Sequence, residues 1–229
     1  MTRSGWAATA ATLPQAARLE RERPFWRTLA GYWEWRWVAD AGCGAGFHAA
    51  LLRELGVSVA GFDLELAALA GGERGRVAVG DITLPPLRTG RFDAVLCLGN
   101  TMSLLPDRAA QRRALAGMAA LVRPGGVVLI QGETASDVSR DGPVVRARAL
   151  EDGALHVRVF ETRGRRVRML AGAARPGGES PLHEVWLLPT SAASLRLLGK
   201  ARGLRSASLP ARPPGAAATW WLALVAPSD

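Results

Sequence analysis

Residues 35–46, WRWVADAGCGAG, decide how the chain folds. The first half of this segment is short, apolar and rich in residues that favour strands, and the second half is a glycine cluster. Residues 47–55 then repeat apolar side chains at helical spacing. A buried strand, a glycine loop and a helix in this order open a β–α–β unit. The segment therefore predicts a parallel sheet whose first strand delivers its carboxyl end to a binding site.

The alternation of strands and helices continues along the chain, and in one stretch it is interrupted. Further strands are predicted at 57–62, 76–79, 92–98, 127–131, 204–209 and 219–225, and helices at 14–30, 64–69, 106–122 and 191–201. From residue 143 the apolar period changes to two, which indicates an antiparallel insertion. We predict an α/β fold with a doubly wound seven-stranded sheet, as one domain over 1–229. A helical flank or lid would occupy about 13–32, and the insertion about 143–188.

Composition narrows the class of protein. The chain has 229 residues, enough for one domain with its own core, and its two cysteines suggest reduced thiols in a cytoplasmic protein. No apolar run reaches the roughly 18 residues of a membrane span, so we expect no membrane anchor. The net charge of +9 comes almost wholly from scattered arginines, which we interpret as compositional bias and not as a nucleic-acid surface. No metal site is predicted.

The glycine loop indicates the kind of ligand. Its pattern is GxGxG, whereas a dinucleotide-binding loop has GxGxxG and would need a glycine at Phe47. Glycines without side chains let a ligand approach the loop backbone closely. An ordinary tight strand-to-helix turn is the alternative interpretation.

Aspartates follow the first three strands. Asp40 ends the first strand, Asp63 follows the second, where a carboxylate can accept from both ribose hydroxyls, and Asp81 follows the third. Asp81 could accept from an adenine amino group, with Ile82 supplying an apolar contact and a backbone N–H. Each aspartate alone is commonly a cap or a turn residue. Together they lie at the edge where open α/β sheets bind ligands.

In order and spacing, these motifs resemble those of class I S-adenosylmethionine-dependent methyltransferases. The matching stretches are DAGCGAG at 40–46, GFDLE at 61–65, VGDI at 79–82, FDAVLCLGNT at 92–101 and VRPGG at 122–126. Residues 98–107 further resemble the LGNS-type segment of the glycine and sarcosine N-methyltransferase group. Leu104 stands where that group usually has a histidine, so glycine itself is not the expected acceptor.

The resemblance implies a fold, a cofactor and a set of site residues. The strand order would be 3-2-1-4-5-7-6 with strand 7 antiparallel, and S-adenosylmethionine would give its methyl group by direct in-line displacement. The expected cofactor contacts are Asp40, Ala41, Gly42, Cys43, Gly44, Gly46, Asp63, Leu64, Asp81, Ile82, Leu98 and Gly99.

The acceptor would lie beyond the end of the fourth strand. Asn100 and Thr101 are expected to orient it, and Glu133 and His183 to contact it, with Asn100 and Glu133 as the catalytic candidates. His48 and Glu184 are further candidate bases. Arginines of the insertion, at 146, 148, 158, 166 and 168, alternate with apolar residues as on a solvated sheet face, and the alternative is that they attract an anionic substrate.

The sequence thus predicts an enzyme that methylates a nitrogen or oxygen of a small molecule. Two alternatives stay open. One is an RNA or protein methyltransferase, and the other is a non-catalytic module that binds S-adenosylmethionine or a partner through the same fold.

Overall fold

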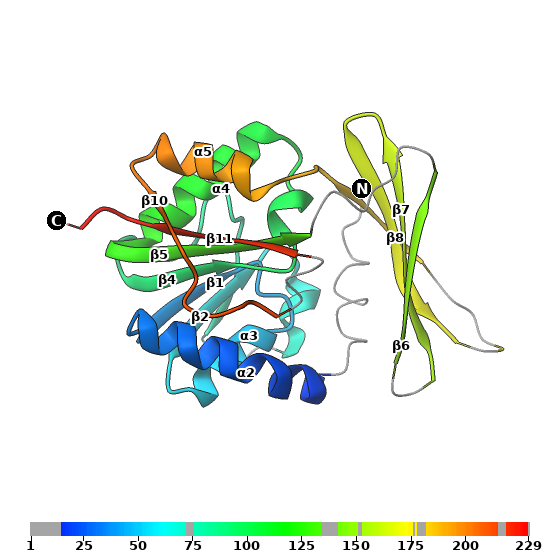
Figure 1. The fold of residues 1–229 in the computed structure, drawn as a ribbon, viewed down its shortest axis with the longest axis horizontal. Coiled ribbons are helices and arrows are strands. Elements are labelled where there is room, and N and C mark those ends of the chain that lie inside the picture. The colour runs from blue at the N-terminus through cyan, green and yellow to red at the C-terminus, as the bar shows by residue number, and fades with distance from the viewer. Residues whose placement is uncertain are drawn as a thin grey trace.

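The computed structural model describes residues 15–71, 76–133, 142–150, 153–175, 177, 182–214 and 219–228. Two sheets make up the fold (Figure 1), a seven-stranded sheet flanked by helices and a four-stranded antiparallel sheet at one end of it.

The seven-stranded sheet has the order β10-β11-β5-β4-β1-β2-β3, which in its own strand numbering is 6-7-5-4-1-2-3. Its strands β1 to β5 are parallel, and β11 runs antiparallel to both β5 and β10. The predicted fold class and strand order are therefore confirmed. The strands are β1 (Trp37–Ala41), β2 (Ser58–Asp63), β3 (Val77–Val79), β4 (Phe92–Cys97), β5 (Val122–Glu133), β10 (Arg205–Ala207) and β11 (Thr219–Val225).

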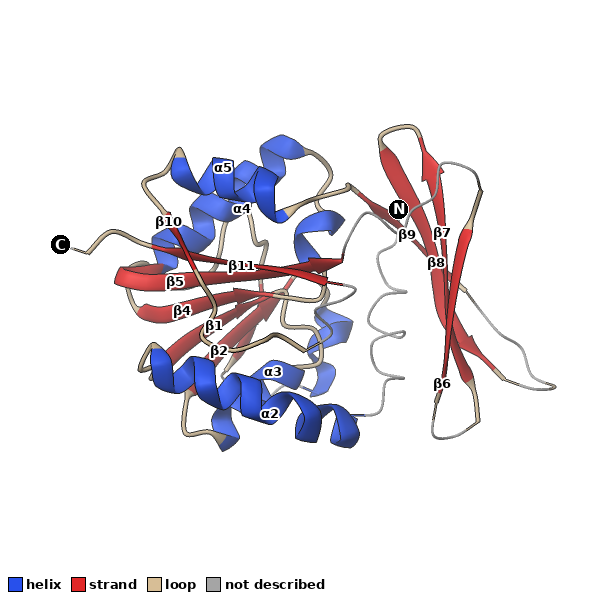
Figure 2. Cartoon of the chain, viewed as in Figure 1, coloured by secondary structure: helices blue, strands red, loops and turns tan. Residues whose placement is uncertain are grey.

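Helices cover both faces of this sheet (Figure 2). On one face lie α2 (Gln15–Tyr32) and α3 (Phe47–Glu54), and on the other α4 (Arg108–Leu121) and α5 (Ala192–Lys200). Two short 3-10 helices, η1 (Leu66–Gly71) and η2 (Thr101–Leu104), follow β2 and β4. The core is accordingly divided by the sheet into two apolar clusters, one around Met118 and Ile130 and one around Trp26 and Leu52.

The insertion forms the second sheet, in the order β6-β7-β8-β9. Its strands are β6 (Val144–Ala149), β7 (Leu155–Arg163), β8 (Arg166–Ala174) and β9 (His183–Leu187). In Figure 1 this sheet stands beyond the carboxyl ends of β4 and β5. One face of it packs against Leu104 of η2 through Phe160, Val167 and Met169. The insertion therefore covers the edge of the parallel sheet at which the site was predicted.

Polar contacts fasten the insertion to the parallel sheet. The N–H of Leu188 donates to the carbonyl of Ser103 (2.7 Å), and the buried Gln111 donates to Met102 O (2.8 Å) and Thr190 Oγ1 (2.6 Å). Arg166 also donates to the carbonyl of Pro106. These bonds fix the η2 segment, which follows the end of β4, against the insertion.

Several elements have other bounds than the sequence indicated. The strand β5 begins at Val122, five residues before the expected start, and η1 is a 3-10 helix. The helix α2 continues through Pro24, although a proline removes a helical hydrogen bond, and Trp26 after the proline donates to Glu22 before it (3.3 Å). The first strand begins at Trp37 and not at Trp35, because Glu34 takes a left-handed conformation (φ 51°) and Trp35 stacks on Trp33.

Candidate active site at the carboxyl ends of the parallel strands

The loop after β1 has a backbone that requires glycine. Gly42, Gly44 and Gly46 have φ of 76°, 52° and 81°, in the left-handed region that L-residues avoid. A Cβ on Gly42 would lie 2.7 Å from Thr101 Cγ2, whereas one on Gly44 or Gly46 would meet nothing within 4 Å. Gly42 is thus needed for packing against the end of β4, and the other two leave space open beside the backbone.

Asp63 holds the glycine loop onto β2. Its Oδ2 accepts from the Gly44 N–H (2.9 Å) and its Oδ1 from the Glu65 N–H (3.0 Å). The N–H groups of Gly42 and Cys43 donate to the carbonyl of Phe62. A carboxylate has about four lone-pair positions, so Asp63 retains capacity to accept from a ligand as well.

Asp40 is a buried carboxyl group with an unused oxygen. It is 2% exposed, and Oδ2 has no hydrogen-bond partner. Burial, with Asp63 as a second cause, raises the pKa of Asp40 to about 7. An orphaned buried acceptor beside a loop with open space fits a ligand that brings a donor or a positive charge, as the amino acid end of S-adenosylmethionine does.

Asp81, the third predicted aspartate, lies in an exposed turn and not in a buried position like Asp40. Asp81 is exposed and its Oδ1 accepts from the Thr83 N–H (2.7 Å), while Ile82 is buried. The Gly80 N–H donates to the carbonyl of Asp63 (2.9 Å), so this turn adjoins the end of β2. Leu64 is half exposed beside it. The structure therefore places Asp63 and Asp81 on neighbouring strand ends.

Cys43 and Cys97 are both buried. Burial raises the pKa of each thiol well above its usual range, which keeps both thiols protonated. Cys43 lies against Gly61 of β2, where an added Cβ would be 2.9 Å from its Sγ. The side chain of Cys43 thus packs the loop onto β2, and any contact with the cofactor would come from its backbone.

The segment after β4 contributes one donor and one acceptor. Asn100 Oδ1 accepts from Ser103 Oγ (2.7 Å) and from the Glu133 N–H (3.3 Å), which leaves the amide nitrogen of Asn100 as a donor. Thr101 donates its hydroxyl hydrogen to the carbonyl of Leu98 (2.7 Å), so its oxygen can still accept. Asn100 also has a left-handed backbone, φ 67°, which is uncommon outside glycine and well tolerated by asparagine.

Sequence reasoning missed Gln131. Its Oε1 accepts from the Gly99 N–H (2.6 Å), and its carbonyl accepts from the Asn100 N–H (3.3 Å). It therefore fixes the turn that carries Asn100. The available signal was the one polar residue at the end of the apolar run VVLIQ at 127–131.

Glu133, at the end of β5, forms an ion pair with Arg158 of the insertion. The five arginines expected on one solvated face are in fact divided between the two faces of the small sheet. Arg146 and Arg158 are direct partners on the face that meets Glu133, whereas Arg168 pairs with Glu161 and Glu184 on the opposite face. Residues of a strand point alternately to its two faces, so the register of β7 with β8 places Arg158 and Arg168 on opposite faces of the small sheet.

The candidate histidines and Glu184 lie in separate places. His48 lies in the first turn of α3 and packs against α2, where burial and then Arg18 hold the pKa of its imidazole well below the usual range. Glu184 is turned to the outer face with Arg168, so it does not meet the site. His183 is opposite Ala171, the partner of Arg158, and so shares the face of Arg158.

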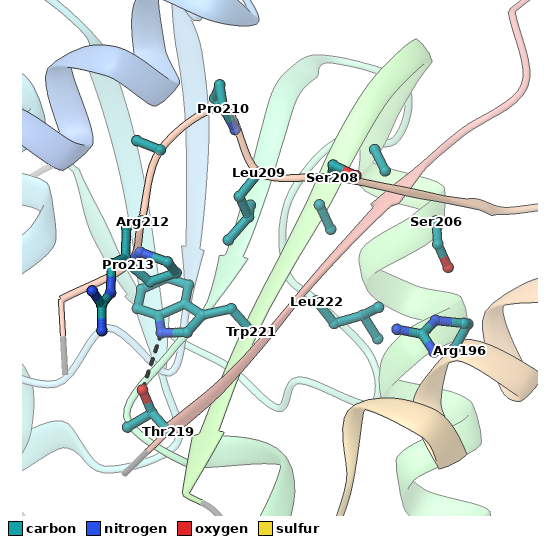
Figure 3. A pocket seen from close by; sticks show the side chains of 13 residues that line it. Arg196, Ser206, Ser208, Leu209, Pro210, Arg212, Pro213, Thr219, Trp221 and Leu222 are labelled. Carbon is teal, nitrogen blue, oxygen red and sulfur yellow. Dashed lines mark hydrogen bonds between the residues drawn. The ribbon is translucent and has the colours of Figure 1, made fainter. Parts of the chain in front are cut away.

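A separate hollow of about 640 Å³ lies at the outer edge of the seven-stranded sheet (Figure 3). It is lined by residues 206–213 and the start of β11, with Trp221 donating to Thr219 Oγ1 (3.2 Å). None of the glycine-loop residues lines it. The chemistry of the site therefore belongs to the strand ends and not to this hollow.

Comparison with known proteins agrees with this placement. Residues 39–130 match the family described as a methyltransferase domain, which spans β1 to β5. Rabbit (Oryctolagus cuniculus) glycine N-methyltransferase is 32% identical over 117 residues, which are 42% of this chain and 40% of the relative. The match thus spans about two fifths of the length of that curated relative.

Solved structures resemble nearly the whole chain. The CcbJ methyltransferase from Streptomyces caelestis has a TM-score of 0.75 at 21% identity and covers 95% of this chain and 92% of its own. The sugar N-methyltransferase KedS8 from Streptoalloteichus has a TM-score of 0.69 at 25% identity, with coverage of 94% and 89%. The glycine loop, the aspartates at the strand ends, the strand order and these similarities together identify residues 39–130 as a methyltransferase domain of the class I S-adenosylmethionine-dependent kind.

Proposed function

We propose that this protein transfers the methyl group of S-adenosylmethionine to a nitrogen or oxygen of a small-molecule acceptor. The observation that carries the proposal is the glycine loop, which Asp63 holds by a hydrogen bond to Gly44. The buried Oδ2 of Asp40, which has no hydrogen-bond partner, lies beside this loop. The second sheet covers the same strand ends. The relatives described as glycine and sugar N-methyltransferases support a small acceptor and favour nitrogen over oxygen.

The residues divide the work between binding and positioning. When bound, the cofactor supplies a methyl group already activated on a sulfonium, so the chain has mainly to hold the acceptor in line and exclude water. Gly42, Gly44 and Gly46 would admit the amino acid end of the cofactor, and Asp63 and Asp81 its ribose and adenine. Asn100 would donate to the acceptor and Thr101 accept from it, because their other polar atoms are occupied.

Glu133 is the candidate base for an acceptor that carries a proton. Its N–H bond to Asn100 places its backbone beside the group expected to orient the acceptor. Its carboxylate, however, is engaged by Arg158. Arg158 donates to Oε1, so Oε2 is the oxygen left to take a proton while this ion pair is closed.

We also propose a cytoplasmic location, which is expected from the cysteine content.

Calorimetric titration with S-adenosylmethionine tests the cofactor site. Gly42→Ala should weaken binding at least tenfold, because the new Cβ would strike Thr101 and also strain a backbone with φ 76°. The matched control is Gly90→Ala, which shares the positive φ (65°) but meets nothing within 4 Å. Each substitution should cost roughly 1–2 kcal/mol of stability for the left-handed backbone alone. Equal cofactor affinity in the two variants would contradict the proposed site.

Turnover is tested separately, by following S-adenosylhomocysteine release with a panel of small amines, amino sugars and alcohols. Binding heat without product on any of them would favour the non-catalytic module. Retention on RNA that weakens as salt rises, together with methylation of that RNA, would favour the nucleic-acid alternative.

A further inference from the structure

The face of the insertion sheet that meets Glu133, here called the inner face, carries a concentration of basic side chains. Across β6 and β7, Arg146 is opposite Arg158 and Arg148 is opposite His156, so all four share one side. His183 joins them on β9 through the register with β8. Among the described residues of these four strands, this side holds no carboxylate.

His156 is the buried member of the group and has an unused ring nitrogen. It is 9% exposed, and its Nε2 has no hydrogen-bond partner. Burial, followed by the charges of Arg158 and Arg148, lowers the pKa of His156, and Glu133 acts in the opposite sense. His156, Arg148, Arg158 and Glu133 are therefore close enough to interact electrostatically.

Glu133 forms an ion pair with Arg158 and is the carboxylate that acts on the charge of His156. Arg148 and Arg158 thus bring two positive charges beside this one carboxylate and beside a buried imidazole whose Nε2 has no hydrogen-bond partner. Arginines arranged in this way suit a carboxylate or phosphate group, which can take two parallel N–H bonds from a guanidinium. The ring of Phe160 adds to this fit. The Cζ atoms of Arg146 and Arg158 lie 5.3 and 5.7 Å from its centroid, and these contacts restrict the side-chain conformations of both arginines.

We propose that the acceptor carries an anionic group, a carboxylate or a phosphate, which replaces Glu133 as the partner of Arg158 and is also bound by Arg148 and His156. This inference rests on the proposed function, because it names the class of acceptor for the same site. The exchange frees the carboxylate of Glu133. Where the reacting group is an ammonium, the proton passes to Glu133, and the nitrogen lone pair then forms the bond to the methyl carbon while the carbon–sulfur electrons return to sulfur.

Titration with simple anions tests the exchange without knowledge of the acceptor. The full chain, saturated with S-adenosylhomocysteine, is titrated with inorganic phosphate and separately with acetate. Arg158→Gln should weaken the binding of the preferred anion at least tenfold. Arg112→Gln, an equal loss of charge at an exposed position of α4, should leave that binding within twofold.

Glu133→Gln distinguishes an exchange from a merely basic surface. Because Glu133 competes with the anion for Arg158, this variant should bind the anion several-fold more tightly than the parent. A basic surface that does not involve Glu133 would give no change. Unchanged anion binding in either Arg158→Gln or Glu133→Gln, with both variants shown to be folded by their unfolding midpoints, would overturn the proposal.

A second readout follows the imidazole of His156. The chain has three histidines, so its NMR signal can be assigned by single substitution. A bound anion should raise the pKa of His156, because it stabilises the imidazolium and offsets Arg148 and Arg158. The parent protein's titration with S-adenosylmethionine separates the two hypotheses. Cofactor binding without anion binding rejects only this inference, and failure to bind the cofactor rejects the proposed function whatever the anion does.

Discussion

Asp40 shows how a single residue can make the stability of the protein depend on pH. Its pKa is raised by burial from 3.8 to about 7, so the folded protein keeps a proton that the unfolded chain loses near pH 4. Protonation therefore favours the folded state, and this contribution is lost as pH rises from about 4 through about 7. At 1.36 kcal/mol per pKa unit, the loss is on the order of 4 kcal/mol.

Replacing Asp40 with asparagine should remove this dependence. We expect the free energy of unfolding of Asp40→Asn, measured in urea without cofactor, to exceed that of the parent increasingly from pH 4.5 to pH 8. The control is Asp81→Asn, an exposed position at which asparagine can keep the turn hydrogen bond. Parallel curves for the Asp40 variant and the parent would mean that Asp40 is already ionised in the folded protein.

At the same scale, the sequence predicts some site residues and misses others for a physical reason. The places of Asp40, Asp63 and Gly42 at or beside the ends of β1 and β2 could be predicted, because the motif fixes where each residue lies relative to its strand. Arg158 and His156 could not be singled out, since their role depends on which side of β7 they occupy. That side is set by the register between distant strands and not by any local pattern.

Among the elements, α2 is the one whose docking bears most directly on the site. Trp26 is fully buried, and its indole N–H donates to the buried Glu22 (3.3 Å). Its ring lies 5.2 Å from that of His48, which is in the first turn of α3 after the glycine loop. The same tryptophan contacts Trp221 of β11. Through Trp26, α2 packs both on α3 and on the sheet.

Trp26→Ala should therefore destabilise the protein by about 3–5 kcal/mol, since it removes a large buried side chain and leaves Glu22 without one donor. It should also weaken cofactor binding, because α3 loses the side chain that packs on its first turn. Chemical unfolding and calorimetric titration measure the two effects. Tyr32→Ala serves as the control on the same helix, because Tyr32 is 65% exposed. A similar loss in both variants would show that α2 does not depend on this contact.

Elements were predictable in kind more than in extent. The apolar period indicated the helices and strands around the parallel sheet, but β5 starts five residues earlier than expected, at Val122, and β1 starts two residues later, at Trp37. At β1 the buried Trp35 stacks on Trp33 and lies before the strand. Contacts of that kind come from tertiary packing, which can override local preference and which no window of sequence contains.

At the scale of the whole molecule, the two sheets are joined at a buried polar contact. Gln111 of α4 has no exposed surface and bonds to Met102 O in the η2 segment and to Thr190 Oγ1 after the insertion. Arg108 donates to its Oε1 (2.7 Å) and to the carbonyl of Pro189 (2.8 Å). Such contacts imply that the insertion and the parallel sheet unfold together, in one transition.

Gln111→Leu should remove the hydrogen bonds that connect the two sheets at this position, while keeping a side chain of similar size. Met102 O and Thr190 Oγ1 would lose a donor, and buried groups left unsatisfied cost about 1–3 kcal/mol. In scanning calorimetry, we expect the parent to show a calorimetric enthalpy equal to its van't Hoff enthalpy, and the variant to fall below that ratio as the insertion begins to melt first. Arg113→Leu, on the exposed side of the same helix, should change stability by no more than about 0.5 kcal/mol and keep the single transition. Two transitions in the parent itself would mean that the insertion is an independent unit, and the site would then depend on how that unit docks.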